Sequence, residues 1–222
     1  MARPSAPSNE HSRPFWHFWE CRCCRTPGEG TRQQLLTAAF EEIHRVGFQA
    51  ASLSRILRHT GLTKGALYHH FPNKQALGYA VVEELIAARV EDFWIRPLEA
   101  GDPIDRLVAI ITEAGRELTR EDIRLGCPLN NLAQEMAPVD EGFRERIEAI
   151  YRRWHEGLAA ALARGQREGT VRPDIDPAGM AVFIVATLEG CLGLAKTAQD
   201  PDLLWQCGGS LIQVLEGLRN KK

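Results

Sequence analysis

The sequence predicts an all-α protein in which three short helices precede a bundle of longer ones. From residue 31 onward, apolar residues recur at the i, i+3, i+4 and i+7 spacing of amphipathic helices, and we find no convincing period-two alternation typical of strands. Glycine, proline and aspartate residues divide the chain into helix-length segments. The chain has 222 residues, of which 44% are apolar, so it can bury one sizeable core or two small ones.

Residues 1–30 differ from the rest because they contain four prolines and two glycines and show no sustained period. We expect a disordered tail over this range. It includes the patch FWHFWECRCC at 15–24, which could serve as an aromatic arm that packs on a neighbour. Its potential metal ligands do not match a recognised zinc spacing, so we predict no metal and no cofactor. These ligands are His17, Cys21, Cys23 and Cys24.

The first predicted helix begins at Thr31 and stops at Gly47. The second follows a cap at Ser52 and ends at Gly61, and the third, KGALYHH, follows a cap at Thr63. Helices this short are marginal in water, so their apolar residues must pack together in a small three-helix core. The predicted core residues are Leu36, Phe40, Leu53, Ile56, Leu62, Leu67 and Phe71.

The chain beyond residue 74 is also predicted to be helical, with Pro97 ending a first long helix. The predicted helices cover 74–96, 103–119, 128–136, 140–168, 177–197 and 201–219.

The longest apolar stretch, AVFIVATL at 181–188, ends at Glu189 and is shorter than the ~20 residues that cross a bilayer. We therefore predict no membrane-spanning segment. No signal-peptide pattern is present at the start, so we expect a cytoplasmic protein. The six cysteines match no disulfide framework, and we expect reduced thiols.

The net charge of −2 conceals a separation of sign along the chain. Residues 31–77 contain six Lys and Arg against two acidic residues, whereas residues 78–222 contain 17 against 24. A compact basic unit joined to a larger acidic one indicates that the basic unit meets a polyanion, and nucleic acid is the obvious polyanion.

Residues 52–70 have the arrangement of a helix-turn-helix, with two short helices joined by a tight bend at Gly61. The second helix of such a unit lies in the major groove of DNA. Thr63 places helix N-terminal amides where a phosphate could bind, and Lys64 can donate to guanine. Gly65 and Ala66 are small enough for close approach to the bases. Donors to phosphate oxygens follow, namely Tyr68, His69, His70 and Lys74.

The segment TRQQLLTAAFEEIHRVGFQAASLSRILRHTGLTKGALYHHFPNKQAL, at 31–77, resembles the DNA-binding domain of the tetracycline-repressor (TetR) family. One departure is Leu57, where many members have alanine. The resemblance implies a helix-turn-helix domain over 31–77, an effector-binding and dimerisation domain over 78–222, and a homodimer that binds a palindromic operator in double-stranded DNA. The predicted DNA-binding residues are Thr31, Arg32, Ser52, Thr63, Lys64, Gly65, Ala66, Tyr68, His69, His70 and Lys74.

Family members dimerise through their last two helices, here 177–197 and 201–219. Two apolar stripes are the candidates for this interface, although each could equally be intrachain core. They comprise Met180, Phe183, Ile184, Thr187, Cys191 and Leu194 on one helix and Leu204, Leu211, Leu215 and Leu218 on the other. Polar and aromatic residues in the middle helices are candidates for the effector site, or for satisfied core positions. They are Phe93, Trp94, Asn130, Asn131, Glu135, Tyr151, Trp154 and His155.

Cys127 precedes Pro128 at a predicted helix start, where the helix dipole would lower the pKa of the thiol. The stretch GCPLNNLAQEMAPVDEGFR, together with Lys196 in GCLGLAK, resembles a TetR subgroup that senses electrophiles and reactive chlorine. This resemblance implies that Cys127 and Lys196 act together as a sensor. The alternative is a regulator that responds to a non-covalent ligand, in which Cys127 is only structural.

The favoured function is a DNA-binding transcriptional regulator that acts as a repressor and is released by a small molecule or by thiol modification. A helical-bundle enzyme is a remote alternative, and we predict no enzyme because HExxH, GxxxxGK[ST], GxSxG and a strand-linked GxGxxG are all absent. A scaffold with a vestigial helix-turn-helix would have lost its basic residues, and these are present.

Overall fold

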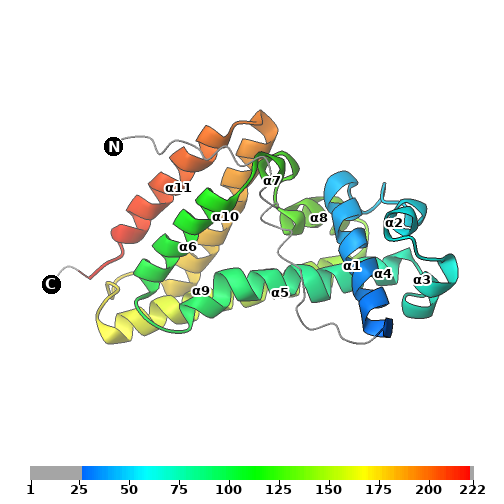
Figure 1. Ribbon diagram of the computed structural model, residues 1–222. Coiled ribbons are helices and arrows are strands. Elements are labelled where there is room, and N and C mark those ends of the chain that lie inside the picture. The colour runs from blue at the N-terminus through cyan, green and yellow to red at the C-terminus, as the bar shows by residue number, and fades with distance from the viewer. Residues whose placement is uncertain (1–26, 221–222) are drawn as a thin grey trace.

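The computed structural model describes residues 27–220, and these fold into helices without a regular strand (Figure 1). The predicted all-α class is therefore confirmed. The helices are α1 Pro27–Val46, α2 Leu53–Thr60, α3 Lys64–His70, α4 Lys74–Ala80, η2 Val81–Ile86, α5 Ala87–Val90, η3 Glu91–Ile95, η4 Arg96–Leu98, α6 Pro103–Glu117, α7 Arg120–Leu125, α8 Pro128–Met136, α9 Glu141–Glu168, α10 Pro177–Ala198 and α11 Pro201–Glu216.

Helix α1 begins four residues earlier than predicted, so Thr31 lies inside the helix and does not open it. The expected tail therefore ends in helical residues at 27–30. The candidate metal ligands His17, Cys21, Cys23 and Cys24 lie outside the described residues. Within residues 27–220 no three His, Cys, Asp or Glu side chains gather in a way that could hold a metal ion.

Helices α1, α2 and α3 form a compact module at one end of the molecule, which we call the N-terminal module (Figure 1). Leu36, Leu67 and Phe71 are almost completely buried in it, as the sequence predicts. Leu53 and Leu62 are partly buried against the same core. The three short helices therefore stabilise one another through a shared apolar centre.

A long helical segment over residues 74–98 connects the N-terminal module to the rest of the chain (Figure 1). It starts as α4, passes through two π-helical stretches and α5, and ends in the 3₁₀ turn η4. The prediction of one helix over 74–96 is confirmed, with an extension to Leu98. Pro97 does not end the helical segment at once, because it lies in the first turn of η4, where a backbone N–H would have no partner within the helix.

The C-terminal helices pack with α10 against both α9 and α11, and with α6 against α11. Short α7 and α8 lie between this bundle and α1 (Figure 1). The prediction for 128–136 matches α8, and the prediction for 103–119 matches α6, which ends two residues earlier at Glu117. A capping box between Thr119 and Asp122 starts the separate helix α7, which was not predicted.

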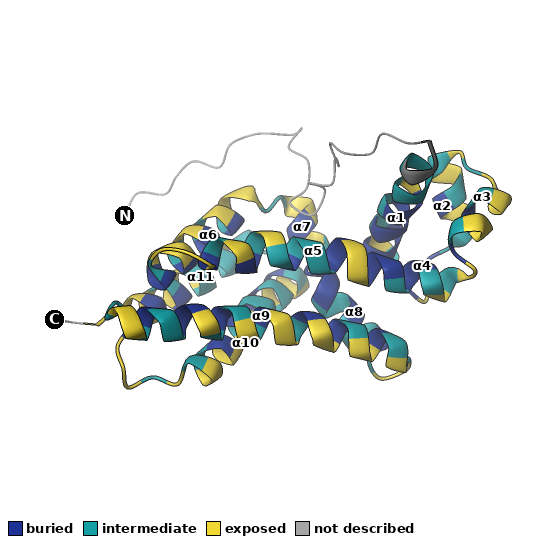
Figure 2. Cartoon of the chain, turned by 90° about the horizontal axis from the view of Figure 1, so that it is seen from below, coloured by how far each residue is buried: buried dark blue, intermediate teal, exposed yellow. Residues whose placement is uncertain are grey.

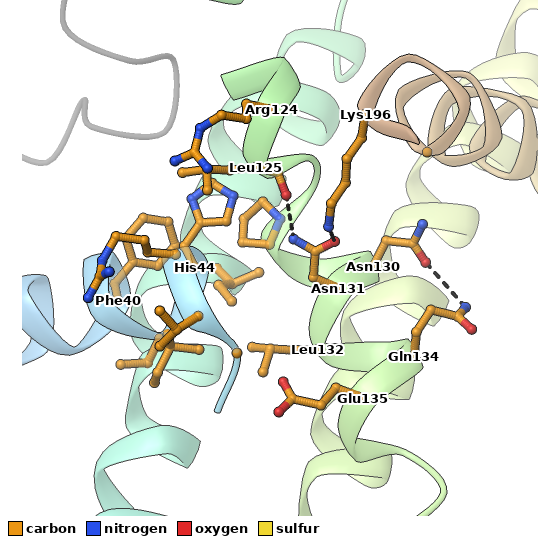
Figure 3. A pocket seen from close by; sticks show the side chains of 18 of the residues that line it. Phe40, His44, Arg124, Leu125, Asn130, Asn131, Leu132, Gln134, Glu135 and Lys196 are labelled. Atoms are coloured by element: carbon orange, nitrogen blue, oxygen red, sulfur yellow. Dashed lines mark hydrogen bonds between the residues drawn. The ribbon is translucent and has the colours of Figure 1, made fainter. Parts of the chain in front are cut away.

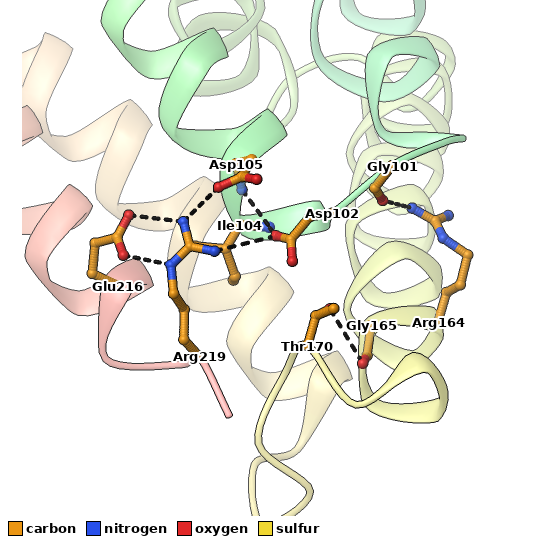
Figure 4. A network of polar contacts seen from close by, with 9 residues as sticks. All are labelled: Gly101, Asp102, Ile104, Asp105, Arg164, Gly165, Thr170, Glu216 and Arg219. Carbon is orange, nitrogen blue, oxygen red and sulfur yellow. Dashed lines mark hydrogen bonds and ion pairs between the residues drawn. The ribbon is translucent and has the colours of Figure 1, made fainter. Parts of the chain in front are cut away.

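Polar contacts hold the end of α11 to the start of α6 (Figure 4). The Arg219 guanidinium donates to Glu216 and, at 2.6 Å, to Asp105. Arg164 of α9 donates to the carbonyl oxygens of Leu98 and Gly101. Exposed ion pairs of this kind contribute at most about 1 kcal/mol each, so the apolar core supplies most of the stability.

Helix α10 is long and apolar enough, by length and composition alone, to cross a membrane, with a mean hydropathy of 1.8. The uninterrupted apolar run at 181–188 is short, but Glu189 and Lys196 are the only charged residues of the 22 in this helix. Length and composition are therefore sufficient for α10 to meet the criterion, and they do not show that it spans a membrane. Here α10 packs between α9 and α11, and yellow exposed positions alternate with buried ones along the helices (Figure 2).

Cys191 of α10 and Cys207 of α11 form a disulfide, with their Cα atoms 6.0 Å apart. The expectation of reduced thiols is therefore wrong for this pair. The two helices are neighbours joined by a short turn, which brings residues 16 apart to the same level of the bundle. Spacing along the sequence does not reveal this proximity.

Candidate nucleic-acid interface and effector region

Helix α3 presents a polar face at the tip of the N-terminal module. The Thr63 hydroxyl accepts a hydrogen bond from the Ala66 backbone N–H at 3.1 Å, so the predicted cap is confirmed. Leu67 is fully buried, whereas Lys64, Gly65 and His69 are exposed and Tyr68 is 53% exposed. Ala66 and His70 are half-buried beside this face.

The buried carboxylate of Glu42 organises the packing of α2 against α1. It accepts hydrogen bonds from the Ser52 backbone N–H at 3.2 Å and from the guanidinium groups of Arg45 and Arg55. These cations hold the pKa of Glu42 below its usual value despite the opposing effect of burial. Ser52 makes no side-chain cap, which corrects the sequence prediction. Sequence reasoning missed Glu42 because it sits beside Glu41 in what looks like a solvated helix face.

Two predicted DNA-binding residues are already engaged within the chain. The Arg32 guanidinium pairs with Glu84 and stacks over the Phe71 ring. The Lys74 ammonium donates to the Gln49 carbonyl oxygen at 3.0 Å, and burial lowers its pKa. Half-buried Thr31 lies beside Arg32 on α1. The exposed candidates on α3 are therefore better placed than these residues to meet an external partner.

Two sets of hydrogen bonds connect the N-terminal module to the C-terminal helices. The Glu135 carboxylate of α8 accepts from the backbone N–H groups of Phe48 and Gln49, both at 2.8 Å. On the other side, His44 Nε2 of α1 is hydrogen-bonded to the Gly126 carbonyl oxygen at 2.7 Å. Gly47 has φ +82°, and a Cβ there would lie 2.8 Å from Glu135 Oε2, so only glycine allows this approach.

A cavity of about 690 Å³ lies between these two connections. Four predicted effector residues line it, namely Asn130, Asn131, Glu135 and Lys196. Figure 3 shows Phe40 and His44 on the side of α1, with Lys196 reaching in from α10 toward Asn131. The cavity is thus bounded by both the N-terminal module and the C-terminal helices.

Cys127 does not have the environment predicted for it. The thiol is buried and donates to Glu189 Oε1 at 3.3 Å. Burial and the nearby carboxylate raise the pKa of Cys127 well above its usual value, which outweighs the helix terminus. Lys196 is hydrogen-bonded to Asn131 and not to Cys127. The expectation of a lowered thiol pKa is therefore wrong.

Glu189 is a functional candidate that sequence reasoning missed. Burial raises the pKa of its carboxyl to about 7, and its Oε2 atom is buried without a hydrogen-bond partner within the described part of the chain. Burial, followed by the charge of Glu189, raises the pKa of nearby Tyr151. The only feature of the sequence that points to Glu189 is its position as an isolated acidic residue after the apolar run at 181–188.

The aromatic effector candidates form a separate cluster. Trp94 lies between Phe93 and Trp154, with ring centroids 5.1 and 5.2 Å away. Trp94 and Trp154 are buried, and the Trp154 indole N–H has no partner among residues 27–220. His155 stacks on Tyr151, and burial lowers its pKa. The predicted effector residues therefore do not form one site.

The residues predicted for the dimer interface also fall into separate groups, some buried and some exposed. Ile184, Cys191, Leu211, Leu215 and Leu218 are buried within the chain's own core and cannot meet a partner directly. Phe183 and Leu194 are 47% and 65% exposed, and Met180, Thr187 and Leu204 are half-buried. The exposed large apolar residues on α10 and α11 are Val182, Phe183, Leu194, Trp205 and Val214.

Comparison with known protein families places both halves of the chain among regulators. Residues 35–81 match the family model described as bacterial regulatory proteins, tetR family. Residues 103–207 match the model described as tetracyclin repressor-like, C-terminal domain.

Individual relatives agree with these matches. The transcriptional regulator AcuR of Cereibacter sphaeroides is 28% identical over 178 residues, which cover 78% of this chain and 79% of AcuR. An uncharacterized HTH-type transcriptional regulator of Mycobacterium tuberculosis is 30% identical over 78% of this chain and 87% of its own length. The HTH-type transcriptional repressor DhaR of Mycobacterium sp. is 25% identical over 82% of this chain and 89% of DhaR.

Solved structures also share the fold. The regulatory protein TetR from Rhodobacter sphaeroides superposes with a TM-score of 0.74 at 25% identity and covers 82% of this chain and 97% of its own. Reduced NemR of E. coli superposes with a TM-score of 0.73 at 22% identity, over 85% of this chain and 97% of NemR. At that identity the likeness to NemR concerns the fold alone, so it gives no support to a sensing chemistry.

Proposed function

The chain belongs to the TetR family of bacterial transcriptional regulators, and from this premise we propose that it is a homodimeric repressor whose helix α3 reads an inverted-repeat operator. It is a DNA-binding regulator and not an enzyme, since the matching families and relatives are all transcriptional regulators. Its place of action is then the cytoplasm, where the operator is. The name of the related repressor DhaR supports the direction of regulation.

The observation that carries the DNA-reading role is the exposed face of α3. Lys64 and Tyr68 project from a short helix that is held in place by the buried side chain of Leu67. A lysine at the first turn suits a guanine edge, and a phenol one turn later suits a phosphate. A single helix covers too few bases for specificity, so a dimer with two copies of α3 is needed.

Fluorescence anisotropy with the duplex DNA that flanks the gene tests this role. We expect Lys64→Ala to cost about 1–3 kcal/mol and to relax specificity at one base pair, whereas Tyr68→Phe weakens binding to all sequences alike. Arg167→Ala is the matched control, because it removes an exposed charge at the far end of α9. If Lys64→Ala binds like the Arg167→Ala control, α3 does not read the DNA.

The dimer interface that we propose is the exposed apolar face of α10 and α11. Phe183 and Leu194 are 11 residues apart and therefore lie on one face of α10. The apolar character of α10, unusual for a surface helix, is explained if a second copy covers it. Buried Ile184 and Leu215 then support this face from inside.

We propose that release from DNA follows binding of a small molecule and does not require thiol chemistry. The hydrogen bond from the buried Cys127 thiol to Glu189 favours the protonated thiol, which is a poor nucleophile. Cys127→Ser should therefore still respond to the inducing molecule. Loss of release in that variant, together with a mass increase of the parent chain at Cys127, would instead establish a thiol sensor.

A further inference from the structure

The wall of the 690 Å³ cavity between α1 and the α7, α8 and α10 helices carries one cation that has no carboxylate partner among the described residues. Arg45 and Arg124 line the cavity but are paired with Glu42 and Glu121. Glu135 accepts two backbone N–H groups. The remaining charged side chain of the wall is Lys196.

Lys196 has a neutral partner only. Its ammonium donates to Asn131 Oδ1 at 2.7 Å, and no carboxylate of the described residues lies within ion-pair distance of it. Asn131 is fixed in this orientation because its Nδ2 donates to the Leu125 carbonyl oxygen at 2.8 Å. Two of the three ammonium N–H donors therefore remain for a ligand. Burial lowers the pKa of Lys196, as expected for a partly desolvated cation without a counter-ion.

The backbone at Gly126 leaves room for the side chain of Lys196. Gly126 has φ +76°, and a Cβ there would lie 2.7 Å from Lys196 Cδ. Glycine therefore lets the lysine stem pass directly over the corner between α7 and α8. Figure 3 shows the side chain extended from α10 toward Asn131, with Phe40 and His44 of α1 on the other side.

Part of the lining is apolar, from Phe40 and Ile43 of α1 and from Leu132 of α8, and the polar side chains of Asn130 and Thr197 lie in the same wall. One unneutralised cation beside apolar surface suits a ligand with one negative charge and a hydrocarbon body. A phosphate dianion would need more positive charge than this wall offers. The volume is within the range of small-molecule sites.

We propose that this cavity binds a small organic monocarboxylate, with its carboxylate on Lys196 and its apolar part against Phe40, Ile43 and Leu132. The binding site itself does not depend on the proposed function. Only the expected consequence of binding, the release of DNA, rests on that function. The ligand would touch both α1 and α8, and the bonds of His44 and Glu135 lie at the two edges of the cavity. Occupancy would therefore change how the N-terminal module is held.

Isothermal titration calorimetry of the full chain without DNA tests the site itself. The probes are sodium hexanoate and sodium benzoate, each with its neutral amide, hexanamide or benzamide. We expect the acids to bind and the amides to bind at least about tenfold more weakly, since a charge-assisted bond is lost. No heat of binding from either acid, or equal affinity for acids and amides, would overturn the proposal.

Substitutions of Lys196 test whether its ammonium binds the carboxylate of the ligand. Lys196→Met should weaken acid binding roughly ten- to hundredfold, and Lys196→Arg should restore most of it. Arg124→Met is the matched control, because its cation lines the same cavity but is paired with Glu121, and it should bind like the parent. A circular-dichroism melt checks that each variant is folded. Unchanged binding by folded Lys196→Met would overturn the assignment.

Operator release is measured separately, by anisotropy of bound DNA with the same acids. If the chain binds the acids through Lys196 but binds no DNA, the assignment of the cavity stands and the proposed function is refuted. If the chain binds DNA through Lys64 but binds neither acid, the proposed function stands and the assignment of the cavity is refuted. The two failures are thus distinguishable.

Discussion

Glu135 provides the sharpest test of how the N-terminal module is attached to the C-terminal helices. Its carboxylate accepts two backbone N–H groups, from Phe48 and Gln49, at 2.8 Å each. Hydrogen bonds to a charged group contribute about 1.5–3 kcal/mol each when buried, and this site is only partly buried. Glu135→Ala should therefore lower the free energy of unfolding by about 2–4 kcal/mol. Glu135→Gln keeps one acceptor oxygen and should lose about half of that.

Urea denaturation followed by circular dichroism, at one fixed protein concentration, measures this loss. Amide hydrogen exchange adds a local readout, since the N–H groups of Phe48 and Gln49 should lose protection first. Gln134→Ala is the matched control on the same helix, because Gln134 is exposed and makes only a 3.4 Å contact with Asn130. A Glu135→Ala loss as small as that of the control, with both amides still protected, would refute this reasoning.

Three further outcomes are expected. The pKa of Glu189 rises from its usual 4.5 to about 7 on folding, so the folded state holds a proton that the unfolded state loses. Stability should fall by about 3 kcal/mol as the pH rises from 4.5 to 7, and Glu189→Gln should remove that part of the pH dependence in urea titrations. Reduction of the Cys191–Cys207 disulfide, or Cys207→Ser, should cost about 3 kcal/mol in the same assay, because the bond closes a loop of 16 residues; no change on reduction would argue against the pairing. Phe183→Glu combined with Leu194→Glu should give a monomer in light scattering, whereas Val139→Glu, at an exposed apolar position outside α10 and α11, should not.

The sequence was sufficient for the elements that local rules decide. The cap at Thr63, the bounds of α8 and the buried centre at Leu67 follow from side-chain chemistry and apolar periodicity within a few residues. Family resemblance placed the helix-turn-helix, and the family matches agree with it.

The parts that failed depend on contacts between distant segments. Ser52 is a residue type that favours caps, but its side chain makes no cap hydrogen bond, and its backbone N–H donates to Glu42, ten residues earlier. Burial, and then the carboxylate of Glu189, 62 residues away, raise the pKa of Cys127, and these effects outweigh its own helix terminus. Nothing local shows that the Glu135 carboxylate of α8 meets the backbone N–H groups of residues 48 and 49. Packing decides such partners, and a single sequence does not reveal it.

The most direct test of the central claim is DNase I footprinting of the intact chain on the DNA that flanks its gene. We expect symmetric protection of an inverted repeat whose half-sites are about one helical turn apart, and we expect salt to weaken this protection and Lys64→Ala with Tyr68→Ala to abolish it. Protection that survives this double substitution, or no salt-sensitive retention of any duplex, would contradict it.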